Sequence, residues 1–144
     1  MTDTTPLTGQ DIGEAEGAVT ALLERAIAPS GRSRAEYITL RVLAAQAPHG
    51  SDAELIDFLT GQRQLGLDCA DVVAMLDRLR ADSLVTATPA GLTAAGHNLL
   101  KELATAVAPI TRQLFTGLDP DDLAVAHRVL VELTQRAQAM TSAA

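Results

Sequence analysis

The sequence predicts a mainly α-helical protein, with six helices and one short β-hairpin arranged as a winged helix-turn-helix. Apolar residues recur at intervals of three and four in six stretches, which Pro, Gly and helix-capping residues separate. Hydrophobic residues make up 47% of the 144 residues but aromatic residues only 2%, so the core must be aliphatic, which suits packed helices. Two short helices around residues 51–81 are followed by TATPAGLT, a segment long enough only for a tight hairpin.

The segment 68–85, DCADVVAMLDRLRADSLV, is the element around which the rest of the chain is organised. Val72, Met75, Leu76 and Leu79 fall on one face of a helix. The segment begins with an Asp, a good N-cap residue, and a second Asp follows three positions later. We therefore expect a helix over 68–81 in the position of a recognition helix, running into a short extended segment.

The remaining helices are marked by their ends. Ser33 and Ser51 each precede a Glu by three residues, which is the capping-box pattern that opens a helix. Pro109 lies within a long helical pattern and is expected to kink it or loosen one turn. The last helix begins with Pro120 after the N-cap Asp119. The predicted helices other than the recognition helix cover residues 10–28, 34–46, 51–59, 94–115 and a segment from 120 to about 140.

The hairpin, called the wing below, is predicted to have strands at 84–87 and 90–93. Pro89 and Gly91 mark the turn between them. The winged helix-turn-helix then spans about 34–93, within a single domain at 10–144 that follows a flexible tail at 1–9.

The terminal helices, at about 10–28 and 94–140, have more apolar surface than a small helix-turn-helix core can cover. In the last helix the apolar residues alternate by three and four, which is a heptad-like seam. These helices are expected to pack against a second copy in a two-fold dimer. The alternative is a six-helix monomer that buries them internally. The residues expected at the dimer interface are Ile12, Val19, Leu23, Leu123, Leu130 and Leu133.

Composition excludes several classes of protein. The net charge of −7 argues against a broadly basic surface for nucleic acid but leaves room for a local basic patch. The single cysteine, Cys69, excludes a disulfide framework and fits a reducing cytoplasm. No apolar run approaches 18 residues, so no membrane partner is expected. His and carboxylate spacing predicts no metal site, and the absence of nucleophile, phosphate-binding and dinucleotide motifs predicts neither a cofactor nor an enzyme.

Four short motifs, in order along residues 10–139, resemble the MarR family of bacterial transcription regulators. They are YITLRVL at 37–43, LDRL at 76–79 followed by Leu84 and Val85, LTAAG at 92–96, and LFTGLD at 114–119. The resemblance implies a homodimer that places helix 68–81 of each chain in a major groove of double-stranded DNA, on a palindromic operator. It also implies a small phenolic or amphipathic effector.

The expected effector pocket lies where three helices of such a fold meet, near Tyr37, Arg41 and His97. Tyr37 and Arg41 are four residues apart and therefore lie on one helix face. The alternative is that Tyr37 belongs to the core and Arg41 is a surface ion-pair partner.

The outward face of helix 68–81 departs from the family's pattern, because its residues cannot donate to a phosphate or pair with guanine as Arg does. The wing sequence TATPAG lacks Arg and Lys altogether. Arg63 is then the best candidate for a backbone contact, with a solvated turn arginine as the alternative. Asp77 and Arg78 are expected to form a structural ion pair, and Arg80 to be exposed. The predicted DNA-contacting residues are Gln62, Arg63, Gln64, Ala70, Asp71, Val73, Ala74, Arg80, Thr86 and Thr88.

Two functions follow. The first is a dimeric DNA-binding transcription regulator that a small effector can control. The second is a winged-helix protein that has lost most DNA affinity and serves as a protein-interaction or ligand-binding dimer.

Overall fold

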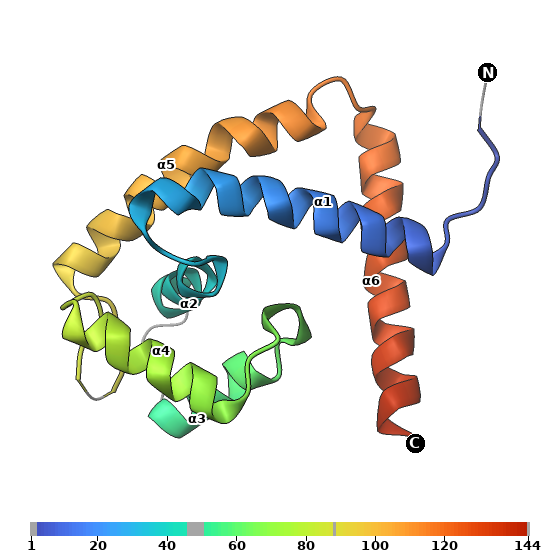
Figure 1. Ribbon diagram of the computed structural model, residues 1–144. Coiled ribbons are helices and arrows are strands. Elements are labelled where there is room, and N and C mark those ends of the chain that lie inside the picture. Colours follow the sequence, from blue (N-terminus) through green and yellow to red (C-terminus); the bar gives the residue numbers. More distant parts are fainter. Residues whose placement is uncertain (1–2, 46–50, 88, 144) are drawn as a thin grey trace. The chain divides into compact units, whose positions relative to one another are not determined.

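The computed structural model describes residues 3–45, 51–87 and 89–143, and this part of the chain contains six α-helices (Figure 1). Two short 3-10 turns, η1 and η2, lie between helices. The described helix ends lie within one residue of their predicted positions, except that the last helix ends two residues later than predicted, so the prediction of a six-helix, mainly α fold is confirmed. The elements are α1 (Gly9–Ile27), η1 (Ala28–Ser30), α2 (Arg34–Ala45), α3 (Asp52–Thr60), η2 (Arg63–Leu65), α4 (Cys69–Ala81), α5 (Ala94–Phe115) and α6 (Pro120–Ser142).

Side-chain caps fix where these helices begin. The Ser33 hydroxyl accepts the backbone N–H of Glu36, whose carboxylate accepts the N–H of Ser33, so the predicted capping box forms at the start of α2. Ser51 and Asp119 also cap their helices as predicted. Thr8 caps α1 and forms a capping box with Asp11, which places the helix start at Gly9, inside the segment predicted as a tail.

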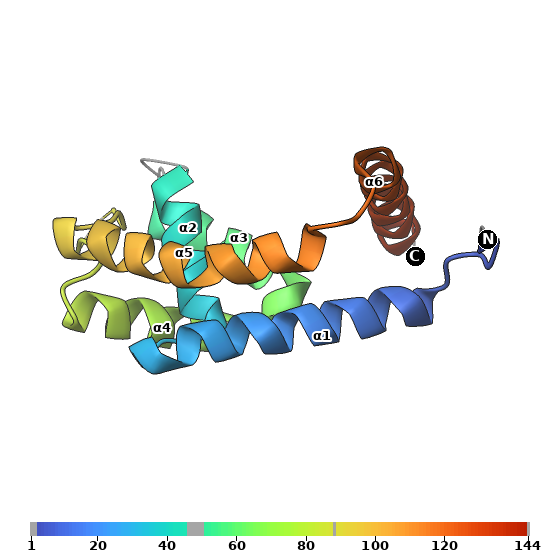
Figure 2. The same ribbon diagram turned by 90° about the horizontal axis from the view of Figure 1, so that it is seen from above.

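The chain divides into two compact units, residues 1–110 and 111–144. In the first unit α3 and α4 pack against each other, and α2 contacts α1. Helices α2, α3 and α4 lie toward the C-terminal end of α1, and the N-terminal half of α1 extends beyond them (Figure 2).

The core of the first unit is aliphatic, as composition predicts, with Tyr37 as the one aromatic side chain among its buried residues. It joins the inward faces of α2, α3 and α4 to the wing and to α5. Its members are Ile27, Tyr37, Leu40, Leu43, Leu55, Leu59, Val72, Met75, Leu76, Leu79, Leu84, Val85, Ala90 and Leu103.

The wing is smaller than predicted. Instead of two strands, the described part of this segment has one antiparallel bridge, between Val85 and Leu92. The Thr86 N–H donates to the Gly91 carbonyl at 2.8 Å and the Thr93 N–H to the Leu84 carbonyl at 3.1 Å. The prediction of a β-hairpin was therefore right about the reversal of the chain but wrong about the strands, because so short a segment has room for only one bridge.

The second unit consists of the end of α5 and α6, and it has no buried residue in α6. Several large apolar side chains of α6 are exposed, including Leu130 at 44% and Leu133 at 40%. No described helix combines the length and apolarity needed to cross a lipid bilayer.

Candidate nucleic-acid interface

Helix α4 has the two faces expected of a recognition helix. Its inward residues Val72, Met75, Leu76 and Leu79 are buried in the core, as predicted. The four predicted groove-facing residues are all exposed, so the structure brings them together on one surface. They are Ala70, Asp71, Val73 and Ala74.

The N-terminal end of α4 is acidic. The Asp68 carboxylate accepts the Asp71 N–H at 2.8 Å, and the Asp71 carboxylate accepts the Asp68 N–H at 3.2 Å. These two carboxylates already satisfy the positive end of the helix dipole, where a phosphate would otherwise bind. A DNA contact from this end of α4 must therefore come from apolar side chains, not from the helix terminus.

The C-terminal end of α4 is fastened by Arg80. Its Nη2 donates to Oδ2 of Asp52 at 2.6 Å, and its Nε donates to the Thr86 carbonyl at 3.0 Å. Oδ1 of Asp52 also accepts the Ala90 N–H at 3.0 Å. Burial raises the pKa of Asp52, but the hydrogen bonds from Arg80 and Ala90 outweigh it, so the pKa lies below its ordinary value. The expectation that Arg80 is simply exposed is wrong, because it is half-buried and holds three segments together.

Arg32 fastens the same end of α4 to the start of α2. Its guanidinium lies 2.7 Å from the Asp82 carboxylate and 3.0 Å from the buried Glu36. The hydrogen bond to Asp82 raises the pKa of Arg32, with a further contribution from Glu36. Sequence spacing could suggest the pair with Glu36, four residues away, but the partner on α4 is 50 residues distant and gives no local signal.

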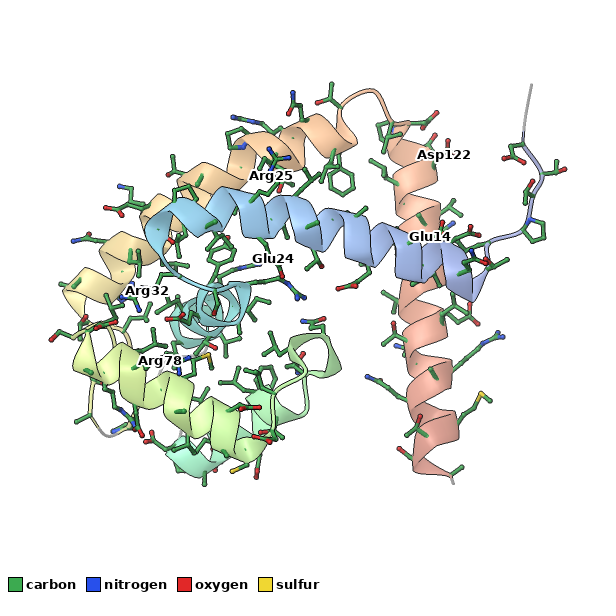
Figure 3. All side chains as sticks on the ribbon, in the orientation of Figure 1. Glu14, Glu24, Arg25, Arg32, Arg78 and Asp122 are labelled. Carbon is green, nitrogen blue, oxygen red and sulfur yellow. The ribbon has the colours of Figure 1, made fainter. Side chains whose placement is uncertain are left out.

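Arg78 is the exposed arginine of α4, and Asp77 beside it is exposed as well. The structural arginine of this helix is thus Arg80, not Arg78 as the sequence suggested. Figure 3 shows Arg78 and Arg32 in the same region, between α4 and the start of α2. A groove of about 340 Å³ lies there, lined by Ser33, Ala35, Leu67, Asp71, Ala74, Met75 and Arg78.

The turn before α4 contains the predicted Arg63 in η2, whose side chain lies outside the described part of the structure. Gln64 beside it is exposed and Gln62 half-exposed. The Gln64 carbonyl accepts a 3.4 Å hydrogen bond from Arg34, which ties this turn to α2. In the wing, the exposed Thr86 donates its hydroxyl to the Pro89 carbonyl. Thr88 lies outside the described residues.

The predicted effector residues come together only in part. Tyr37 is buried and the Arg41 guanidinium lies 5.6 Å from the centre of its ring, a cation–π contact. His97 is exposed in the first turn of α5. The groove beside Arg78 is lined by none of these three residues.

The predicted dimer residues are only partly covered within a single chain. Ile12, Leu23 and Leu123 are half-buried, whereas Val19, Leu130 and Leu133 are exposed. Among the residues that the structure describes, no group of three His, Cys, Asp or Glu side chains could hold a metal ion.

The chain was compared with protein families, curated proteins and solved structures. No protein-family model and no curated protein matches the chain. Several solved structures match the chain. Apo MarR from E. coli has a TM-score of 0.68 at 21% identity, over 92% of this chain and 98% of that one. CouR from Rhodococcus jostii, bound to p-coumaroyl-CoA, has a TM-score of 0.66 at 22% identity, over 84% and 86%.

A third similar structure is a MarR family protein of Mycobacterium tuberculosis in complex with salicylic acid. Its TM-score is 0.64 at 24% identity, over 89% of this chain and 99% of that one. Nearly the full length of two of these regulators is matched. The chain therefore has the winged-helix fold of the MarR-type transcription regulators.

Proposed function

We propose that the protein is a dimeric transcription regulator of MarR type, which binds a pseudo-palindromic site in double-stranded DNA through α4 of each protomer. The observation that supports this most is the two-faced α4, whose inner residues are buried while Ala70, Asp71, Val73 and Ala74 form an exposed outer face. In this fold such a helix fits the major groove, where Val73 and the alanines could contact thymine methyl groups.

The dimer is supported by apolar surface that a single chain leaves exposed. Val19 on α1 is 38% exposed, and Leu130 and Leu133 follow the heptad-like seam of α6. A water-exposed seam of this kind is stabilised when two copies bury it together.

Control by a small effector is supported by the ligands of two structural relatives, salicylic acid and p-coumaroyl-CoA. In this chain the groove beside α4 combines apolar walls from Leu67, Ala74 and Met75 with the exposed guanidinium of Arg78 at one place and Asp71 at another. A small aromatic or aliphatic ligand that pairs with Arg78 and keeps any negative charge away from Asp71 would fit these walls, and it would touch α4 directly. We infer this groove as a second candidate site, besides the pocket expected near Tyr37, Arg41 and His97.

One observation favours the second function, a dimer that has lost most of its DNA affinity. Residues 51–93 contain seven acidic and three basic side chains, a formal charge of −4. Arg32, Arg34 and Arg80, all near α4, are engaged with Glu, Asp or backbone groups. Few cations therefore face the phosphates, and phosphate neutralisation provides most of non-specific affinity.

A titration separates the two functions. Fluorescence anisotropy with the protein's own upstream DNA and with a random duplex, at several salt concentrations, is expected to show tighter binding to the upstream DNA. If Arg63 and Arg78 of both protomers contact phosphates, four contacts predict a slope of about −3.6 for log K against log salt. No binding at low salt would contradict the first function and favour the second. Specific binding that Arg63→Ala leaves unchanged would contradict only the assignment of that contact.

A further inference from the structure

The wing of this protein has little hydrogen bonding of its own. Its described part has one antiparallel bridge, and a two-stranded hairpin so short is marginal in water. Yet Ala90, in the returning half of the wing, is buried in the core at 2% exposure. Packing of Leu84, Val85 and Ala90 in the core therefore holds the wing along with the bridge, and a pair of charged side chains adds a third contact.

The pair Arg80–Asp52 contacts both halves of the wing. Arg80 donates to the carbonyl of Thr86 in the outgoing half, and Asp52 accepts the N–H of Ala90 in the returning half. A 2.6 Å hydrogen bond from Arg80 to Asp52 connects these two contacts. Both side chains are about three-quarters covered, which reduces the screening of their charges by water.

We propose that Arg80 and Asp52 are positioning residues, which set the orientation of the wing relative to α3 and α4 in place of a β-ladder. Asp52 is the first residue of α3, and Arg80 lies in the last turn of α4. The two helices and the wing are thereby fixed as one DNA-facing unit. Arg80 then acts through the wing and not by contacting a phosphate. The part of this inference that concerns DNA rests on the function proposed above.

We call the pair Arg80–Asp52 the clamp. Amide hydrogen exchange of the full-length protein tests its role without DNA. In Asp52→Ala, which removes both acceptor oxygens, the Ala90 amide is expected to exchange at least tenfold faster, while the amide of Leu40 in α2 keeps its rate. Arg80→Lys keeps the charge and the pairing with Asp52 but lacks the Nε donor to Thr86. Loss of this bond to the Thr86 carbonyl should loosen the outgoing half of the wing, so the Thr86 N–H, which donates to Gly91, should exchange faster while Ala90 stays slow. Unchanged exchange at Ala90 in Asp52→Ala would overturn the proposal, as would equal acceleration at Ala90 and Leu40.

Binding to a labelled 30-base-pair random duplex at low salt is a second test, because the two explanations predict opposite changes in DNA affinity. Removing a negative charge near DNA should strengthen binding if charge alone matters. If the clamp positions the wing, Asp52→Ala instead weakens binding at least threefold, whereas the matched control Asp57→Ala on the same helix does not. Stronger binding by Asp52→Ala would overturn the role in DNA binding. Wild-type protein that fails to bind would contradict the proposed function, and the exchange rates would still decide the clamp.

Discussion

Gly96, in the first turn of α5, lies directly against the backbone carbonyl of Leu84 at the start of the wing. A Cβ built at Gly96 would overlap that oxygen and would also press on the Leu92 side chain. The Leu84 carbonyl cannot move away freely, because it accepts the N–H of Thr93. This contact explains physically why the LTAAG segment ends in Gly.

Gly96→Ala is therefore expected to lower the free energy of unfolding by about 1–3 kcal/mol, the usual cost of forcing extra atoms into a packed site. Urea denaturation measures it. Gly13→Ala is the matched control, because nothing lies within 4 Å of the Cβ position there and Ala is the better helix former. Gly13→Ala should leave stability unchanged or raise it by about 0.5–1 kcal/mol. A Gly96→Ala protein as stable as wild type would show that this close contact is absent.

Adjacent valines on α4 should behave differently. Val72 is fully buried, so Val72→Ala should cost about 2 kcal/mol of stability from lost burial and a small cavity. Val73 is 39% exposed, so Val73→Ala should change stability by less than about 0.5 kcal/mol. Val73→Ala should instead reduce the preference for specific over random DNA in the anisotropy titration. The reverse pattern would mean that the outer face of α4 is misassigned.

The low pKa of Asp52 predicts a pH dependence of stability. A carboxyl whose pKa is lowered by folding stabilises the protein above its unfolded pKa, near 3.8, and this contribution is lost as the pH falls through the folded value. Asp52→Asn should therefore destabilise the protein by about 1 kcal/mol at pH 7, and wild type and variant should converge below pH 3.8. Urea denaturation from pH 3 to 7 measures the difference. A difference that stays constant over that range would contradict the account.

Charged residues in the α6 seam should separate the protomers of the proposed dimer. Replacing Leu130 and Leu133 together by Glu places four like charges in the seam of two chains and removes apolar burial. Sedimentation equilibrium at micromolar concentration should give about half the wild-type mass. Gln135→Glu adds a charge outside the seam and should leave the dimer intact. A wild-type protein that sediments as a monomer would refute the dimer itself.

The sequence predicted the helices well because their signals are local. Caps such as Ser33 and Asp119 lie beside the helix they begin, and the buried face of α4 follows directly from apolar spacing. The arginines were predicted poorly, because their roles depend on partners far along the chain. Arg80 pairs with Asp52, 28 residues away, and Arg32 with Asp82, 50 residues away. Nothing in the immediate neighbourhood of Arg78 and Arg80 shows that the second of them is the structural one.

The wing illustrates the same limit. Pro89 and Gly91 predicted a reversal of the chain, and the reversal is there. The number of bridges and the clamp from Arg80 depend on how α3 and α4 pack, which no local pattern of the wing contains. The exposure of Ala70, Asp71, Val73 and Ala74 on α4 was predicted correctly, because exposure follows from the same helical period as burial.

Selection of DNA duplexes from a random pool by the protein tests most directly whether a two-fold dimer binds DNA through α4. A dimer that places α4 of each protomer in successive major grooves should enrich a pseudo-palindrome whose half-sites are centred about 10 base pairs apart. With so few cations near α4, the enrichment should be strongest at low salt. A pool that shows no enrichment at low salt, or an enriched site without two-fold symmetry, would contradict the proposal.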